Sequence, residues 1–227
     1  MKSIPHITVI DPAVRVPELD VLNRISGASP LSITYHLPGL HGMRSLELVA
    51  GDPAGIVLLG SGSSVHDALP WQQELGAWLR ARMEAGIPTL GLCFGHQFVA
   101  HLFGAEVGYL RQDRAKHLGF FQTQLEPDAL WGGKAVSGEL YCAHREQVIA
   151  LPPGFRSVGR SGDLPLEALR HESLPLWTFQ AHPEATRGFI ENQGDTLPAP
   201  GRLAFGHSLV DAFLDFCGGK REARKYE

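Results

Sequence analysis

A cysteine lies between two glycines in the segment Thr89–Gln97, which reads TLGLCFGHQ. An apolar run leads into Cys93 and a helical pattern leaves from Gly95, as in a nucleophile elbow with cysteine in place of serine. The glycines make room for a sharp turn, and the helix N-terminus behind the sulfur favours a thiolate. The spacing predicts a cysteine nucleophile, with the backbone N–H of Phe94 facing a developing oxyanion. A buried core cysteine between two packing glycines accounts for this segment equally well.

A histidine and a glutamate follow an apolar run in the segment Thr178–Glu184, which reads TFQAHPE. A cysteine nucleophile needs a base, and the base needs a group that orients it. Pro183 fixes a turn between His182 and Glu184, which lets the carboxylate reach the imidazole. Alone, this segment is typical of a surface turn. Together with the cysteine motif it predicts a Cys-His-Glu triad.

A run of small residues follows another apolar stretch in Leu58–Asp67, which reads LLGSGSSVHD. Small residues let backbone N–H groups approach a ligand closely, as in anion-binding nests. The segment lacks the GxxxxGK[ST] pattern of a phosphate loop. Taken alone it predicts an ordinary flexible turn.

The elements that would position these residues alternate between strands and helices through the first half. Four short apolar runs without polar alternation predict strands covered on both faces, at 6–11, 31–36, 55–60 and 89–93. An apolar stripe of helical spacing begins at Pro70 and ends before Gly86, and shorter helices are expected over 95–102 and 209–217. Strand-like runs fill 116–180, and 192–201 reads as an exposed connection. This order predicts an α/β fold with a mostly parallel sheet and antiparallel additions in the second half.

Length and composition narrow the class of protein. The chain has 227 residues, of which 44% are hydrophobic and 19% charged, which excludes disorder as the main state. We expect one domain, 1–227. The net charge of −4 is too mild to favour nucleic acid or an anionic membrane as the partner, and the charged stretch 220–227 is expected to be a solvated end.

Cysteine and histidine spacing predicts neither disulfides nor a metal site. The three cysteines are widely separated, and neither a CxxC nor an HExxH pattern occurs. Cys142 and Cys217 lie in apolar runs and are expected to be small core residues. No signal-peptide pattern is present, and no apolar run approaches the ~18–20 residues of a membrane-spanning helix. We therefore expect a cytoplasmic protein without a metal or cofactor.

The motifs together resemble one family. GLCFGHQ, QAHPE and the small-residue loop are similar to those of class I, triad-type glutamine amidotransferases, especially stand-alone domains like the amidotransferase part of GMP synthase. The run 60–65 (GSGSSV) matches a GSPxSV-like loop, and 143–154 (AHREQVIALPPG) matches another family segment. The resemblance implies a flavodoxin-like fold with a central sheet flanked by helices.

The resemblance also implies roles for particular residues. Cys93 would be the nucleophile, His182 the general base and later acid, and Glu184 the group that orients His182. The backbone N–H groups of Phe94 and Ser61 would form the oxyanion hole. The implied substrate pocket consists of Gly60, Gly62, Gln97, Ala143, Arg145 and Glu146. The implied reaction converts the side-chain amide of glutamine to glutamate and ammonia through a γ-glutamyl thioester.

Five positions depart from the family pattern. Gly62 stands where many members have proline, so less rigidity is expected in the loop. Ala181 replaces a frequent phenylalanine and is expected to widen the pocket. Ala143 and the Arg145–Glu146 pair replace other residues in the pocket segment. These departures bear on the substrate more than on the chemistry.

Three functions therefore stay open. The first is a glutaminase that passes ammonia to a separate synthetase subunit, since no synthetase sequence is attached to this chain. The second is a stand-alone γ-glutamyl hydrolase or peptidase with the same triad. The third is a non-catalytic ligand-binding or regulatory module, against which the intact Cys93, His182 and Glu184 argue.

Overall fold

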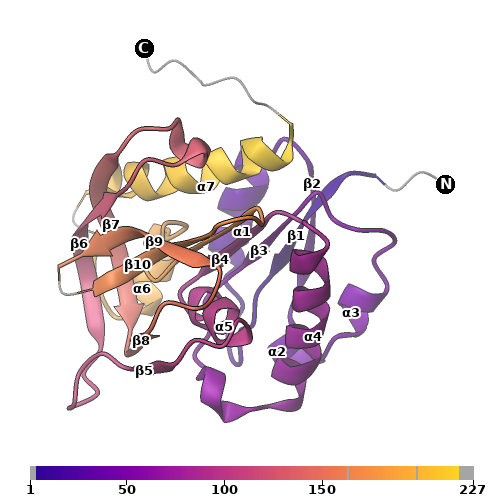
Figure 1. Cartoon of the computed structure of the whole chain (residues 1–227), viewed down its shortest axis with the longest axis horizontal. Coiled ribbons are helices and arrows are strands. Elements are labelled where there is room, and N and C mark those ends of the chain that lie inside the picture. The colour runs from indigo at the N-terminus through magenta and orange to yellow at the C-terminus, as the bar shows by residue number, and fades with distance from the viewer. Residues whose placement is uncertain (1–3, 163, 198, 220–227) are drawn as a thin grey trace.

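A mixed sheet forms the centre of the molecule (Figure 1). The computed structural model describes residues 4–162, 164–197 and 199–219, so the expected tail at 220–227 lies outside it. Within these residues nine strands pair in the order β2-β1-β3-β4-β11-β10-β9-β6-β7. In this order, neighbouring strands from β2 to β11 pair in parallel, and neighbouring strands from β11 to β7 pair antiparallel. The predicted α/β fold with antiparallel additions is confirmed.

The parallel strands are short, and all of them except the edge strand β2 are buried, as the apolar runs predict. Every residue of β1, β3, β4 and β11 is buried, because helices cover both faces of this part of the sheet. The parallel strands are β2 (Ser32–His36), β1 (His6–Ile10), β3 (Gly55–Leu58), β4 (Thr89–Leu92) and β11 (Leu176–Phe179).

The antiparallel strands come from the strand-rich second half of the sequence. They are β10 (Leu164–His171), β9 (Phe155–Ser161), β6 (His117–Leu125) and β7 (Val136–His144). A separate two-stranded sheet joins β5 (Val107–Tyr109) to β8 (Glu146–Val148), with Tyr109 opposite Glu146. Because β8 follows β7 almost directly, the small sheet lies next to the end of the large one.

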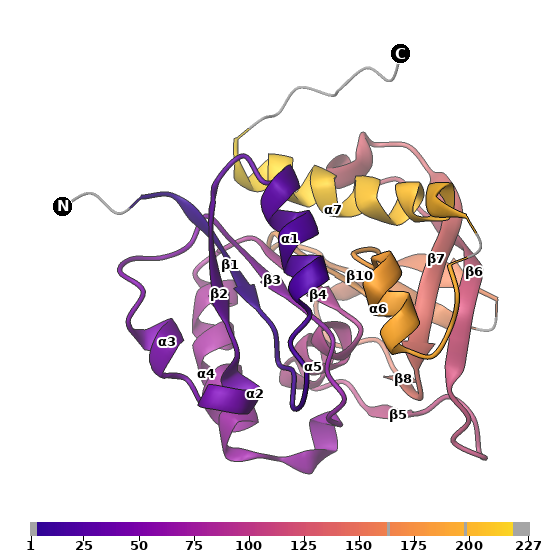
Figure 2. The same ribbon diagram turned by 180° about the vertical axis from the view of Figure 1, so that it is seen from behind.

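Helices lie on both faces of the sheet (Figures 1 and 2). One face carries α1 (Leu19–Ala28), α6 (Arg187–Asn192) and α7 (Ala204–Cys217), and the other carries α4 (Pro70–Glu84) and α5 (Phe94–Leu102). The short helices α2 (Pro38–His41) and α3 (Arg44–Glu47) adjoin α4. The predicted helices at α4, α5 and α7 are present, whereas α1 and α6 lie where no helix was expected.

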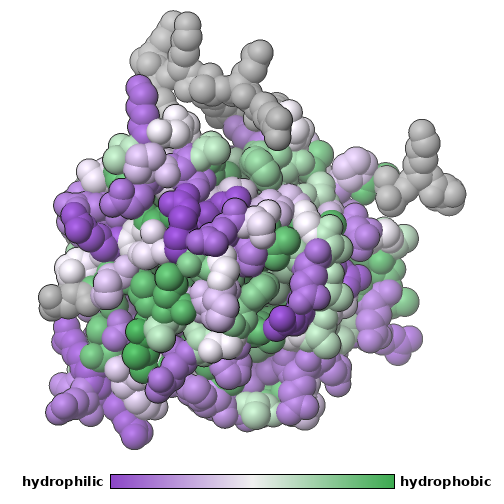
Figure 3. All heavy atoms as spheres, in the orientation of Figure 1, coloured by the Kyte–Doolittle hydropathy of each residue, from purple (hydrophilic) through white to green (hydrophobic). Residues whose placement is uncertain are grey.

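The core is divided by the sheet into two apolar clusters. Val21 and Ile25 of α1 pack with Phe213 and Leu214 of α7 on one side, and Leu75 and Leu79 of α4 pack with the aromatic residues of α5 on the other. On the face drawn in Figure 3, hydrophilic side chains dominate the margin and apolar ones gather toward the centre. Among the described residues, no helix combines the length and the apolar character needed to cross a bilayer.

Candidate active site

The three segments singled out in the sequence follow the carboxyl ends of adjacent parallel strands. β3, β4 and β11 lie side by side, with Leu58 opposite Gly91 and Leu92 opposite Phe179. The small-residue loop leaves β3, the cysteine leaves β4, and the His-Pro-Glu segment follows β11. Ligands of open α/β sheets bind at this edge. The topology thus brings together residues that lie far apart along the chain.

Cys93 occupies a strained turn between β4 and α5. Its φ of 52° and ψ of −104° lie outside the regions that L-residues usually adopt, and it serves as the N-cap of α5. A Cβ on Gly91 would lie 2.7 Å from the carbonyl oxygen of Gly95, and a Cβ on Gly95 would overlap the carbonyl oxygen of Leu58. Both glycines are therefore required by the close approach of backbone, as the elbow pattern predicts.

His182 and Glu184 form a buried pair next to Cys93. Nδ1 of His182 lies 2.8 Å from Oε1 of Glu184, and the two residues are only 4% and 2% exposed. Because this carboxylate accepts a hydrogen from Nδ1, the other ring nitrogen is left for the cysteine, with which the imidazole also interacts. The chain of contacts from carboxylate to imidazole to sulfur has the arrangement that nucleophilic catalysis requires.

The pKa of His182 reflects three opposing influences. Burial lowers it, because a charged imidazolium is poorly solvated there, but the anionic forms of Cys93 and Glu184 raise it. The two anions outweigh the burial, and the pKa rises to about 10. At neutral pH the imidazole therefore holds a proton between the Glu184 carboxylate and the Cys93 sulfur.

The last helix supports the turn that carries His182. A Cβ on Gly206 of α7 would lie 2.7 Å from the carbonyl oxygen of Pro183, so the helix packs against the turn backbone to backbone. The ring of His207 is 2.8 Å from the Ala185 carbonyl oxygen, and the His182 N–H donates to the Tyr141 carbonyl oxygen of β7 at 2.7 Å. The turn is thus held from both sides.

The loop after β3 is fixed by side-chain contacts. Ser61 Oγ donates to the Pro12 carbonyl oxygen at 2.7 Å, and Ser64 Oγ donates to Glu146 at 3.0 Å. Gln72 Nε2 donates to the Ser64 carbonyl oxygen at 2.9 Å. These bonds hold the loop in place, which offsets the reduced rigidity expected from glycine at position 62.

Gly60 is needed for space rather than for backbone freedom. Neither it nor Gly62 has a positive φ. A Cβ on Gly60 would lie 3.0 Å from Cε1 of His182 and 3.7 Å from Cβ of Cys93. Any larger residue there would press on the imidazole.

The side chain of Gln97 links α5 to the pocket wall. Its Nε2 donates to the Glu146 carbonyl oxygen at 2.7 Å and to Oε1 of Gln180 at 3.1 Å. Nε2 of Gln180 in turn lies 3.9 Å from the Cys93 sulfur. Because both hydrogens of the Gln97 amide nitrogen have protein acceptors, the amide oxygen is the atom left to meet a ligand.

A cavity of about 690 Å³ opens above Cys93 and collects most of the predicted residues. Its lining contains Ser61 and the three residues of the predicted triad, Cys93, His182 and Glu184. It also contains all six predicted pocket residues, Gly60, Gly62, Gln97, Ala143, Arg145 and Glu146. Phe94 is the exception, because its side chain is buried in the core while its N–H belongs to the first turn of α5. The volume suits a small organic ligand.

Sequence reasoning missed several residues of this cavity. Lys116 lines it and donates from Nζ to Oε1 of Gln193 at 2.5 Å, and burial lowers its pKa. Glu18 lines the opposite part, where burial and the nearby Asp11 raise its pKa to about 7. No sequence motif surrounds either residue, so nothing in the neighbouring sequence predicts that it lines the cavity.

Ala181 does not widen the pocket. It is fully buried in the apolar cluster on the α7 side and is not among the lining residues, and its N–H donates to Oε1 of Glu167 at 2.8 Å. Residue 181 points away from the cavity because its neighbour His182 points into it.

The sequence is similar to a known protein family and to particular members of it. Residues 40–193 match the family model of class-I glutamine amidotransferases. One subunit of the glutamine-hydrolyzing GMP synthase from Pyrococcus abyssi is 33% identical over 138 residues, which cover 61% of this chain and 70% of that protein. Its counterpart from Thermococcus kodakarensis is 34% identical with the same coverage.

Solved structures show the same fold. The structure of a glutamine amidotransferase from Methylobacillus flagellatus matches with a TM-score of 0.72 at 20% identity, covering 100% of this chain and 98% of the other. A glutamine amidotransferase from Thermotoga maritima matches with a TM-score of 0.68 at 17% identity, covering 94% and 97%. The family match spans more than half of the chain and includes the segments after β3 and β4 and the His-Pro-Glu turn, and so this chain belongs to the class-I glutamine amidotransferases.

Proposed function

We propose that this amidotransferase hydrolyses the side-chain amide of glutamine through a covalent thioester on Cys93. The observation that carries the proposal is the buried His182–Glu184 pair beside a cysteine at a strained elbow, at the floor of a cavity. His182 acts as acid and base, and Glu184 orients its ring.

In the first half of the reaction the Cys93 thiolate attacks the amide carbon of glutamine. The carbonyl π-bond opens to an oxyanion, and the nitrogen takes the proton held by His182. The C–N bond then breaks, ammonia leaves, and the carbonyl re-forms as a γ-glutamyl thioester. His182 is now neutral and able to act as a base.

In the second half water attacks the thioester while His182 accepts its proton. The C–S bond breaks, glutamate leaves, and the thiolate is restored beside a protonated His182. In both halves the oxyanion would be met by the N–H groups of Phe94 and Ser61, and the loss of one such donor in comparable sites costs ~3–4 kcal/mol of transition-state stabilisation.

The remaining cavity residues would hold the amino-acid end of the substrate. Gln97 offers its amide oxygen, and the segment from Ala143 to Glu146 offers backbone groups and the charged side chain of Arg145. Gly60 and Gly62 keep the facing wall free of side chains. Together these groups match a zwitterionic ligand that carries one amino and one carboxylate group.

We further propose that the ammonia passes to a separate synthetase subunit. The support is that relatives at about one-third identity are named as one subunit of a glutamine-hydrolyzing GMP synthase. Free glutaminase activity would waste glutamine, so turnover is expected to rise when the matching synthetase is bound.

The deciding experiment is product analysis of the purified chain with glutamine and, in parallel, with γ-glutamyl peptides. Release of ammonia and glutamate from glutamine, lost in Cys93→Ala, supports the proposal. Cleavage of the peptides with poor turnover of glutamine would reject it in favour of a γ-glutamyl hydrolase.

One observation keeps the hydrolase as a second candidate. The cavity extends to Glu18 and Asp11 on the β1 side, beyond the residues assigned to glutamine, and its volume of about 690 Å³ leaves room for a larger leaving group. Acidic groups in that part would suit a γ-glutamyl amide whose amine portion is cationic. Faster cleavage of γ-glutamyl amides with cationic than with neutral amine portions would support this candidate.

A further inference from the structure

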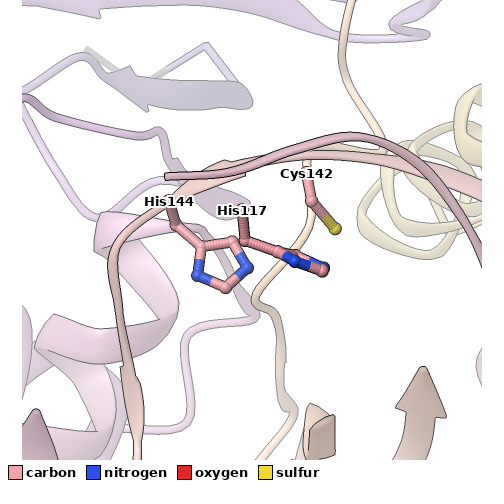
Figure 4. A group of neighbouring side chains, drawn as sticks. All are labelled: His117, Cys142 and His144. Atoms are coloured by element: carbon pink, nitrogen blue, oxygen red, sulfur yellow. The ribbon is translucent and has the colours of Figure 1, made fainter. Parts of the chain in front are cut away.

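Two histidines and a cysteine gather at the ends of β6 and β7, beside the cavity (Figure 4). His117 and His144 are direct partners in the antiparallel ladder, and Cys142 precedes His144 by two residues and so shares its face of the sheet. One ligand atom from each of the three side chains lies within 4.8 Å of the other two. No chain-local spacing predicts this cluster, because strand pairing creates it.

The ring nitrogens of both histidines are incompletely bonded. Nδ1 of His144 lies 2.9 Å from the Glu146 carbonyl oxygen, so it carries the hydrogen and Nε2 presents a lone pair. That Nε2 is buried and has no hydrogen-bond partner among the described residues, and the same holds for Nδ1 of His117. Buried polar atoms are normally paired, so two such atoms next to a thiol point to a ligand.

The surroundings are those of a metal-binding histidine. Metal-ligating imidazoles usually donate their other N–H to a carboxylate or a backbone carbonyl, as His144 does to Glu146. The ring of His117 is further held by stacking on Phe121, with centroids 3.8 Å apart.

Space for an ion is present because a glycine faces the cysteine. Gly119 is the ladder partner of Cys142, and a Cβ built there would meet no neighbouring atom closer than 4.0 Å. Tetrahedral Zn²⁺ requires nitrogen and sulfur ligands about 3.5 Å apart, so side-chain rotations that close the cluster by about 1 Å suffice.

We propose that His117, Cys142 and His144 form a three-ligand site for a soft divalent cation of the Zn²⁺ type. Two imidazoles and a thiolate select such an ion over Mg²⁺ or Ca²⁺. The Cys142 thiol loses its proton to solvent as the metal–sulfur bond forms. The ion links β6 to β7, and through His144 it adjoins the Glu146 carbonyl oxygen that also binds Gln97.

The test uses the Cys93→Ala chain, which has no catalytic thiol to compete for metal. Titration with Co²⁺ is expected to produce a sulfur-to-cobalt charge-transfer band that saturates at one ion per chain. Replacing a ligand in this background, as in Cys142→Ser, should abolish the band and weaken binding by at least about 100-fold, more than the loss of an outer partner costs. The controls Cys217→Ser and His41→Gln, which lie outside the cluster, should leave both unchanged.

A thermal measurement gives an independent readout. At a Zn²⁺ concentration about 100 times the Kd, the melting temperature should rise by about 5–10 °C, and the rise should vanish in the ligand variants. If Cys142→Ser does not fold, as judged by circular dichroism, His117→Gln and His144→Gln decide the outcome. Absence of the band in Cys93→Ala, or its persistence in the ligand variants, would overturn the proposal. Because glutamine turnover is not measured, failure here is separate from failure of the proposed glutaminase.

Discussion

The hydroxyl of Ser64 donates a hydrogen bond of 3.0 Å to Oε1 of Glu146, which lies 82 positions further along the chain. This bond ties the loop after β3 to the first residue of β8. The backbone oxygen of the same glutamate accepts from Gln97 of α5. Glu146 thus connects the loop after β3, the small sheet and the helix α5 that follows Cys93. The loop that carries the Ser61 N–H is therefore fixed by a contact with another part of the chain.

Removing that connection should lower catalysis without unfolding the protein. A hydrogen bond of this kind contributes ~0.5–1.5 kcal/mol, so Ser64→Ala is expected to reduce kcat/KM for glutamine about 2–10-fold. Ser173→Ala, at an exposed serine just after β10, serves as the control and should have no effect. Unchanged kinetics in Ser64→Ala would mean that the loop is held by its other contacts alone.

The strained backbone at Cys93 should affect the free energy of unfolding. Cys93→Ala and Cys93→Gly both remove the thiol and should both lose more than about a thousandfold in activity. At a φ of 52°, however, glycine escapes a cost of ~1–2 kcal/mol that alanine bears. We expect urea denaturation to find Cys93→Gly more stable than Cys93→Ala by about 1 kcal/mol.

The control for this comparison lies in the same helix. Ala100 is in the interior of α5, where glycine should be less stable than alanine by about 1 kcal/mol. Opposite signs at the two positions would establish the strain, and equal signs would argue against it.

A glutamine-like diazo-ketone should label Cys93 in the wild-type protein and spare Cys142 and Cys217.

The charge on His182 should depend on both of its partners. His182→Ala is expected to be nearly as damaging as loss of the cysteine, and Glu184→Ala less so. In Cys93→Ala the sulfur that raises this pKa is gone, so the pKa of His182 should fall well below about 10, as followed by NMR titration of the ring. A pKa that stays unchanged would show that the sulfur carries no charge at this site.

The same pKa predicts how stability varies with pH. Because the folded-state pKa of His182 lies above its ordinary value of 6.5, its contribution is complete below pH 6.5 and declines as the pH rises toward about 10. The difference in melting temperature between the wild type and His182→Gln should therefore shrink over this range. A constant difference would contradict the raised pKa.

A buried acid beneath the triad should give a second pH effect. Glu167 of β10 is fully buried, and burial raises its pKa from 4.5 to about 8. Its neutral form therefore favours the fold below pH 4.5, and this contribution is lost as the pH rises through about 8. Glu167→Gln, which stays neutral, should gain stability relative to the wild type between about pH 5 and about pH 8.5. Exposed Glu172→Gln is the control, and a matching change there would reject the burial argument.

Much of the fold could be predicted because the apolar runs are local signals. The parallel strands β1, β3, β4 and β11 are buried on both faces, so their sequences lack polar alternation, and α4 shows a clear stripe ending before Gly86. Helix α1 escaped prediction because only Val21 and Ile25 face the core and no side chain caps its start. Helix α6 has a single pair of buried residues in six, too few to show a period.

Some residues of the candidate site could likewise be predicted from the sequence, and others could not. Cys93, His182 and Glu184 lie in short motifs whose turn geometry requires glycine or proline, so their roles could be proposed from the sequence. Lys116 and Glu18 reach the cavity through strand order and loop path, which the sequence does not state. The bracing of the loop by Glu146 likewise depends on β8 pairing with β5.

The backbone contact between Gly206 and Pro183 has a consequence for biosynthesis. The turn that carries His182 rests on α7, which is made after every strand of the sheet. In a nascent chain on the ribosome, His182 lacks this backing until residues 204–217 have emerged. The Cys93 thiol would therefore lack a fully supported base until α7 has been made and has packed against the turn.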